Sequence, residues 1–195
     1  MHHHQVPNVR PFPLRSLLLV TLLILFPDHS SFDGSSHIIS LNPLLPWTGG
    51  PSNLLYYNVT RDVQYIQFQQ GCNNLLHAPA VHPPRTRLVL SVPSLPPWST
   101  IEVRNDNGVT AYDVLARIRD VLNRSVSPAE MGAMVSVSAV ASEYFRVRTH
   151  ADPREFAQGV KRIDFLGPNV IFAGLRSIDG QDRWEVRFMP SAQRA

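Results

Sequence analysis

The clearest pattern in the chain is the helical spacing of apolar residues between Val109 and Arg124. Six apolar side chains recur there at intervals that place them on one face of a helix, and polar side chains fill the other positions. They are Ala111, Val114, Leu115, Ile118, Val121 and Leu122. Thr110 and Asp113 form the Thr-x-x-acid pattern that caps a helix N-terminus. The pattern predicts an amphipathic helix with one face against a core.

Strand patterns precede this helix. Arg87–Val92 is rich in β-branched residues, and apolar and polar residues alternate in Thr100–Arg104. Val63–Phe68 alternates in the same way and predicts a further strand. Ile38–Leu45 is apolar but interrupted by Pro43, which predicts an edge segment or a strap over the core.

A second helical region follows the first helix. Ser127 precedes a proline and stands three positions before Glu130, which is a helix start signal. The region is rich in Ser and Val, so a strand over Val135–Ala139 stays open as an alternative, while Ala139–Arg148 is predicted to be helical. One more helical turn is predicted near Pro153.

The spacing changes again in the last part of the chain. Asp164 lies between two apolar residues in Ile163–Phe165, which predicts a strand, and a turn at Gly167 would return the chain as a β-hairpin. A further turn near Asp179 leads into Arg183–Phe188, where three apolar residues alternate with charged ones.

These elements predict an α+β fold. We expect a single domain with a mainly antiparallel sheet, packed against the amphipathic central helix and the second helical region. A chain of 195 residues is long enough to bury one sizeable core. We expect a leader with a linker over residues 1–36, the domain over residues 37–190 and a tail over residues 191–195.

The strongest hydrophobic run is Leu14–Phe26, which has Arg10 and Arg15 at its front. This layout is typical of a secretory signal, and the run falls short of the roughly 20 apolar residues of a spanning helix. It favours the secretory pathway or membrane association, with an intracellular location as the alternative. On the first interpretation, Asn58 and Asn123 are glycosylation acceptors in Asn-x-Ser/Thr patterns.

Charge and cysteine content narrow the classes of partner. The net charge is +3, and acidic residues are interspersed among the basic ones, so neither half has the one-signed excess of a nucleic-acid binder. Membrane contact is expected only through Leu14–Phe26. Cys72 is the single cysteine, which excludes an internal disulfide framework and a cysteine-based zinc site.

The sequence carries no recognisable catalytic or cofactor motif. A Gly-x-Ser-x-Gly elbow, a phosphate loop, a dinucleotide glycine motif and an HExxH pattern are all absent. We therefore assign no catalytic, cofactor-binding or metal-ligating residue and expect no cofactor. His77, His82 and Cys72 are interpreted as two loop histidines and a packed thiol.

Two weaker alternatives remain. Asp113 and Asp164 are the carboxylates that could act as general acid and base, while the competing interpretation is a helix cap for Asp113 and an exposed or arginine-paired position for Asp164. The only basic concentration could bind phosphate or RNA, although acidic residues dilute it. It consists of Arg146, Arg148, Arg154, Lys161 and Arg162.

Seven short patterns occur in a fixed order along the chain. They are Leu41–Leu45, Tyr57–Val59, Ala78–Pro84, Pro97–Val103, Val109–Leu115, Gly159–Leu166 and Phe172–Leu175, followed by Trp184. In this order they resemble a fungal, mostly basidiomycete, family of small domains of unknown function (DUF6699). Tyr57-Asn58 departs from the Trp-Asp pair usual in that family, and Ala141–Tyr144 stands where more arginines are usual. The resemblance implies a fold and a lineage but no activity.

Taken together, the sequence favours a non-catalytic protein-interaction or scaffold domain. It offers proline-flanked, aromatic-rich loops that suit contact with another chain. The three tryptophans, Trp47, Trp98 and Trp184, either line a groove or pack as core and lid. We expect the partner to be a protein and not a nucleic acid.

Overall fold

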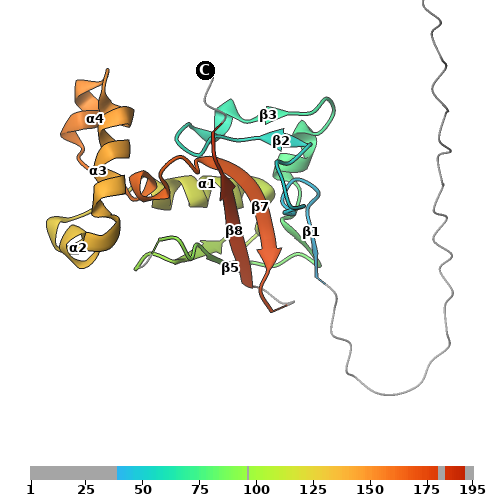
Figure 1. Ribbon diagram of the computed structural model, residues 1–195. Coiled ribbons are helices and arrows are strands. Elements are labelled where there is room, and N and C mark those ends of the chain that lie inside the picture. The colour runs from blue at the N-terminus through green and yellow to red at the C-terminus, as the bar shows by residue number, and fades with distance from the viewer. Residues whose placement is uncertain (1–38, 96, 180–182, 192–195) are drawn as a thin grey trace, which may run out of the picture. The chain divides into compact units, whose positions relative to one another are not determined.

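The computed structural model describes residues 39–95, 97–179 and 183–191 (Figure 1). Four strands form the main sheet, β5 (Arg87–Ser91), β6 (Thr100–Arg104), β7 (Ile171–Ser177) and β8 (Arg183–Met189), in the order β6-β5-β8-β7. The β5–β6 and β7–β8 pairs are antiparallel, and the central β5–β8 pair is parallel. The predicted α+β fold with a mainly antiparallel sheet is confirmed. The run Leu14–Phe26 lies outside the described residues.

The face of the sheet that meets the core carries the apolar residues of the predicted alternation. Leu88 pairs with Val103 and Leu90 with Ile101, and all four side chains are buried. Because successive residues of a strand point to opposite faces, Glu102 falls on the other face. The alternation seen in the sequence therefore sets the inner and outer faces of β5 and β6.

Helix α1 (Ala111–Leu122) covers the inner face and is seen behind β7 and β8 in Figure 1. Its six apolar residues are all buried, as the spacing predicts. The Thr110 hydroxyl accepts a hydrogen bond from the Asp113 backbone N–H, and the Asp113 carboxylate accepts one from the Thr110 N–H. Arg117 Nε donates to the backbone oxygen of Glu102 at 3.0 Å, which ties α1 to β6.

The segment before β5 wraps around the sheet in short pieces. Strand β1 (Ser40–Leu41) pairs with β4 (Val81–His82), and β2 (Leu55–Tyr56) pairs with β3 (Gln67–Phe68). The predicted strap is confirmed, because Leu45 is buried and its oxygen accepts a hydrogen bond from the Leu175 N–H of β7.

The strand predicted over Val63–Phe68 is wrong for its first half. Val63–Tyr65 forms a 3-10 helix, because the Asp62 side chain accepts a hydrogen bond from the Gln64 N–H and so caps a helical turn. Only Gln67–Phe68 is extended.

The strap approaches β7 so closely that one position must be glycine. Gly174 has φ of +132°, and a Cβ atom there would lie 2.6 Å from the Trp47 backbone nitrogen. The pairing of β7 with β8 is irregular between Phe172 and Gly174. The close contact holds the end of the strap beside the backbone of β7.

The second helical region forms three helices, α2 (Pro128–Ala133), α3 (Val135–Thr149) and α4 (Pro153–Ala157). The strand alternative for Val135–Ala139 is wrong, since that stretch opens α3. Two β-branched residues cost a helix only a few tenths of a kcal/mol each, which the remaining turns of α3 offset. None of the described helices is long and apolar enough to cross a membrane.

The strand and hairpin predicted around Ile163–Phe165 are also wrong. Arg162–Leu166 is a 3-10 helix in which Asp164 is buried along with its apolar neighbours. A strand would have placed Asp164 on the opposite face from them, whereas its burial is compensated by an ion pair with Arg148. The alternating segment predicted over Arg183–Phe188 is confirmed as part of β8, which pairs antiparallel with β7.

Candidate functional site

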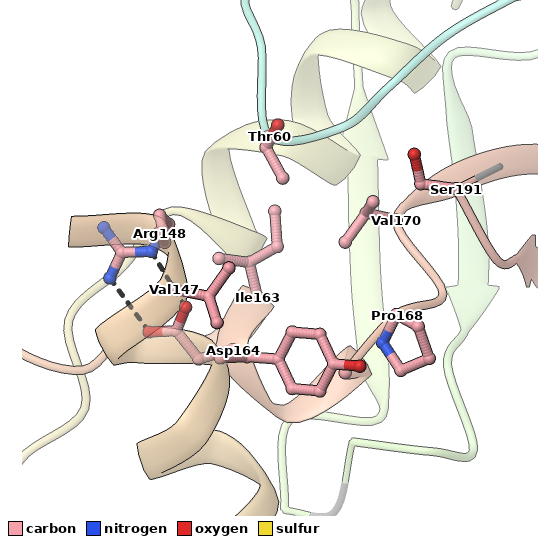
Figure 2. A pocket seen from close by; sticks show the side chains of 10 residues that line it. Thr60, Val147, Arg148, Ile163, Asp164, Pro168, Val170 and Ser191 are labelled. Carbon is pink, nitrogen blue, oxygen red and sulfur yellow. Dashed lines mark hydrogen bonds and ion pairs between the residues drawn. The ribbon is translucent and has the colours of Figure 1, made fainter. Parts of the chain in front are cut away.

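A cavity of about 350 Å³ opens beside α3, and we call it the apolar cavity (Figure 2). Its walls come from the loop after β2, from α3, from the Arg162–Leu166 helix, from the residues that lead into β7 and from the segment after β8. The ten residues that line it are Thr60, Tyr144, Val147, Arg148, Ile163, Asp164, Gly167, Pro168, Val170 and Ser191. Most of this surface is hydrocarbon, as is usual for sites that bind organic ligands.

A row of apolar side chains on α3 borders this cavity. We call it the α3 stripe; it consists of Val137, Val140, Tyr144 and Val147. The spacing of three and four residues places them on one side of the helix. Val140 is 45% exposed and Val147 67% exposed, whereas Ala141 and Thr149 of the same helix are buried. Helix α3 therefore presents apolar residues to solvent as well as to the core.

Glycine at position 167 lets the stripe close over the cavity edge. A Cβ atom at Gly167 would lie 3.4 Å from both the Val140 and the Tyr144 side chains. Gly167 also has φ of +59°, a conformation that other residues rarely adopt. The turn after the Arg162–Leu166 helix therefore fits under the α3 stripe because it carries no side chain.

The polar part of the cavity wall is an ion pair between Arg148 and Asp164, drawn in Figure 2. Arg148 Nε donates to Asp164 Oδ1 at 2.8 Å and Nη2 donates to Oδ2 at 2.9 Å. The Lys161 backbone N–H donates to the same Oδ2 at 2.8 Å. Hydrogen bonding to Asp164 raises the pKa of the Arg148 guanidinium above its ordinary value, against the opposing effect of burial. The Asp164 oxygens and the Arg148 guanidinium are therefore hydrogen-bonded to each other within the wall.

A second hollow of about 490 Å³ adjoins the first, and we call it the charged groove. It is lined by Thr60, Arg119, Asn123, Arg148, Glu155, Gln158, Lys161 and Ile163. Thr60, Arg148 and Ile163 belong to both linings. The two hollows are therefore neighbours that share one wall.

The cations of the charged groove converge on one carboxylate. Lys161 Nζ donates to Glu155 Oε2 at 2.7 Å, and Arg148 Nη1 donates to the same oxygen at 2.6 Å. Lys161 is only 5% exposed. The third cation of the lining, Arg119, pairs instead with Asp62 at 3.2 Å.

The structure does not bring the two predicted carboxylates together. Asp113 caps its own helix and accepts a hydrogen bond from Asn105 Nδ2 at 2.8 Å. Partial burial would raise the pKa of Asp113, but the hydrogen bonds from Asn105 and Thr110 outweigh it and lower the pKa. Asp113 lines a separate hollow beside β6. The interpretation of Asp113 as a cap and of Asp164 as arginine-paired is confirmed.

Most of the predicted basic concentration is engaged in ion pairs within the domain. Arg148 and Lys161 are paired as described, and Arg162 lies 3.6 Å from Glu130 and stacks 4.7 Å from the centre of the Trp98 ring. Arg146 is exposed on α3. Three of the five cations are therefore paired within the domain, while Arg146 and Arg154 are exposed.

The remaining predicted residues lie apart from the two hollows. His77 stacks on Tyr112 with ring centres 5.5 Å apart, His82 is exposed, and Cys72 packs partly buried against the core. Within residues 39–95, 97–179 and 183–191, no cluster of His, Cys, Asp or Glu could hold a metal ion. Trp98 and Trp184 are buried, and Trp47 lies on the outer side of the sheet near Arg187.

The asparagines predicted as glycosylation acceptors lie close to the site. Asn123 lines the charged groove. Asn58 Oδ1 accepts hydrogen bonds from the Thr60 N–H and hydroxyl, and Thr60 lines both hollows. No sequence pattern indicates that the two acceptors flank one site, because their proximity depends on the tertiary fold.

Sequence reasoning missed Tyr144 and Val147, which belong to the exposed stripe. The available signal was the spacing of three and four residues between the apolar positions of Val137–Val147.

Fold and site together define a small α+β domain that carries the apolar cavity. The charged side chains beside this cavity are paired with one another. Residues 55–187 match a model described as a family of unknown function (DUF6699), and the chain belongs to that family. The resemblance to this family that the sequence indicated is thereby confirmed, whereas the fungal lineage stays a prediction. No curated protein and no solved structure matches the chain.

Proposed function

We propose that the domain is a non-catalytic protein-interaction module and that it binds its partner through the apolar cavity and the α3 stripe. The observation that carries this proposal is the exposed valine pair, Val140 and Val147, at the edge of an apolar hollow. Burying apolar surface gains about 25 cal/mol per Å². Contiguous apolar surface beside a hollow is typical of a binding site for another chain.

The state of the polar groups supports binding over catalysis. Both Asp164 oxygens accept hydrogen bonds from Arg148, and one also accepts from the Lys161 N–H. Donors from Arg148 and Lys161 therefore already occupy both Asp164 oxygens. This arrangement favours a cavity wall that orients a ligand over one that reacts with it.

Peptide selection tests the proposal without knowledge of the natural partner. Random peptides displayed on phage would be selected on the immobilised full-length chain and retested on Val147→Glu. We expect enrichment of peptides with large apolar side chains and a loss of at least about tenfold in affinity for the variant, because a charge would enter the apolar contact.

Val135→Glu is the matched control. Val135 is a valine of the same helix, 72% exposed, at a position off the α3 stripe. It should bind the selected peptides like the wild type, and both variants should keep the wild-type circular dichroism spectrum. Peptides that bind Val147→Glu and Val135→Glu equally well, or no enrichment over a bare surface, would refute the proposal.

We also propose that the chain enters the secretory pathway, with membrane contact confined to Leu14–Phe26. The support is the apolar run behind two arginines. The test is expression of the full chain in a fungal host, followed by endoglycosidase treatment and mass spectrometry of Asn58 and Asn123. A glycan at Asn58 on a chain that starts after Phe26 is expected. An unglycosylated soluble product that retains Met1 would contradict secretion.

A further inference from the structure

We infer that the ligand is a peptide carrying a carboxylate beside a large apolar side chain, with the side chain in the apolar cavity and the carboxylate in the charged groove. This inference rests on the proposed function and adds the chemical class of the ligand. The carboxylate can belong to a peptide C-terminus or to an acidic side chain, and the test below separates these two sources.

The first support is the geometry of the two hollows. They share Thr60, Arg148 and Ile163, and Figure 2 shows these three side chains along one side of the apolar cavity. A ligand that fills the apolar cavity with one group therefore reaches the charged groove with the group beside it. Adjacent groups of a single peptide satisfy that requirement.

The second support is the charge balance of the groove lining. Three cations line it, Arg119, Arg148 and Lys161, against one carboxylate, Glu155. The counter-ions Asp62 and Asp164 do not line the groove. A hollow lined by three cations and one carboxylate has a positive local potential.

The third support is the unused hydrogen-bonding capacity of a buried cation. Lys161 Nζ has three N–H donors, and Glu155 is its one acceptor among the described residues. Arg119 Nε is buried and has no acceptor in the described part of the chain. Buried charged donors favour a charged acceptor, and an incoming carboxylate supplies two oxygens.

Four fluorescent peptides of one length test the inference on the full-length chain produced in bacteria, which adds no glycan at Asn123. The first ends in Gly-Ser-Gly-Phe with a free carboxylate, and the second is its C-terminal amide. The third is an amide with an internal Phe-Glu pair, and the fourth replaces Phe of the first by Ser. Binding is measured by fluorescence anisotropy.

We expect the first peptide to bind at least about tenfold more tightly than its amide, and the Ser peptide to lose binding. Tight binding of the third peptide would assign the carboxylate to a side chain, and weak binding would assign it to the C-terminus. Lys161→Met and Arg119→Gln should each reduce the difference between acid and amide. Arg176→Gln, on β7 away from both hollows, should leave it unchanged.

The outcomes distinguish the inference from the proposed function. If the acid and the Phe-Glu peptide both bind wild type no more tightly than the amide, and Val147→Glu weakens all three, the carboxylate inference is wrong and the interaction module stands. If no Phe peptide binds and phage selection also fails, both are wrong. Since Lys161 is buried, a wild-type melting curve for Arg119→Gln keeps the test valid even where Lys161→Met does not fold.

Discussion

Replacing Asp164 by Asn tests whether the ion pair at the cavity wall stabilises the domain. The Asp164 side chain is 1% exposed and accepts three hydrogen bonds, two from Arg148 and one from the Lys161 N–H. Asn would keep the shape, remove the charge and turn an N–H₂ group toward a donor. Breaking a buried ion pair costs about 3–5 kcal/mol. Because the Arg148 side chain remains 16% exposed, we expect the lower end, about 3 kcal/mol.

Urea unfolding of the full-length chain, followed by circular dichroism, measures this loss. With a slope of about 2 kcal/mol per M, the midpoint should fall by about 1.5 M. Glu102→Gln is the control, since its pairs with Arg87 and Arg104 lie in solvent and should leave the midpoint close to that of the wild type. An Asp164→Leu, Arg148→Met double variant should regain most of the stability that Asp164→Leu loses. A wild-type midpoint for Asp164→Asn would refute the reasoning.

Three further predictions concern the core, the strap and the acid limit of stability. Leu115→Asp places an unpaired charge on the fully buried face of α1, which costs several kcal/mol. We expect no folded chain by circular dichroism. A cooperative melt like that of the wild type would show that α1 does not pack on the core through Leu115. Gly174→Ala introduces a Cβ against the Trp47 nitrogen at a positive φ and should cost about 1–3 kcal/mol in urea unfolding, whereas an unchanged midpoint would mean that the strap does not hold this contact. Hydrogen bonds from the Ser127 backbone, the Ser127 hydroxyl and Trp98 lower the pKa of Glu130 from 4.5 to about 2. The folded pKa lies below the unfolded one, so this stabilisation is complete above pH 4.5 and is lost as the pH falls toward 2. The stability difference between wild type and Glu130→Gln, followed by urea titration across this range, should shrink on acidification, and a constant difference would contradict the prediction.

The elements predicted correctly are those whose signals are local. Thr110 with Asp113 and Ser127 with Glu130 form capping boxes at the positions that the sequence indicates. A capping box needs only residues within one turn, so tertiary contacts do not alter it. Alternation is less specific, since a strand also needs a neighbouring strand to pair with. Ile163–Phe165 has none and forms a 3-10 helix instead.

The site was harder to predict because its parts are distant in sequence. The sequence allows Asp164 to pair with an arginine. Which arginine it pairs with, Arg148, depends on how α3 packs on the Arg162–Leu166 helix. The lining of the apolar cavity includes both Thr60 and Ser191, which are far apart in the sequence. No periodicity in the sequence indicates that they meet. The exposed α3 stripe was visible as spacing, but only burial distinguishes it from a core face.

The parallel pairing of β5 with β8 has a consequence for how the domain folds. β5 is made early and β8 after all four helices, so during synthesis β5 has β6 on one edge and unpaired N–H and C=O groups on the other. The centre of the sheet is completed by this long-range contact, and closing such a long loop is slow. The domain must therefore complete its folding after β8 leaves the ribosome. Until then the growing chain exposes an unpaired strand edge, which is prone to aggregation.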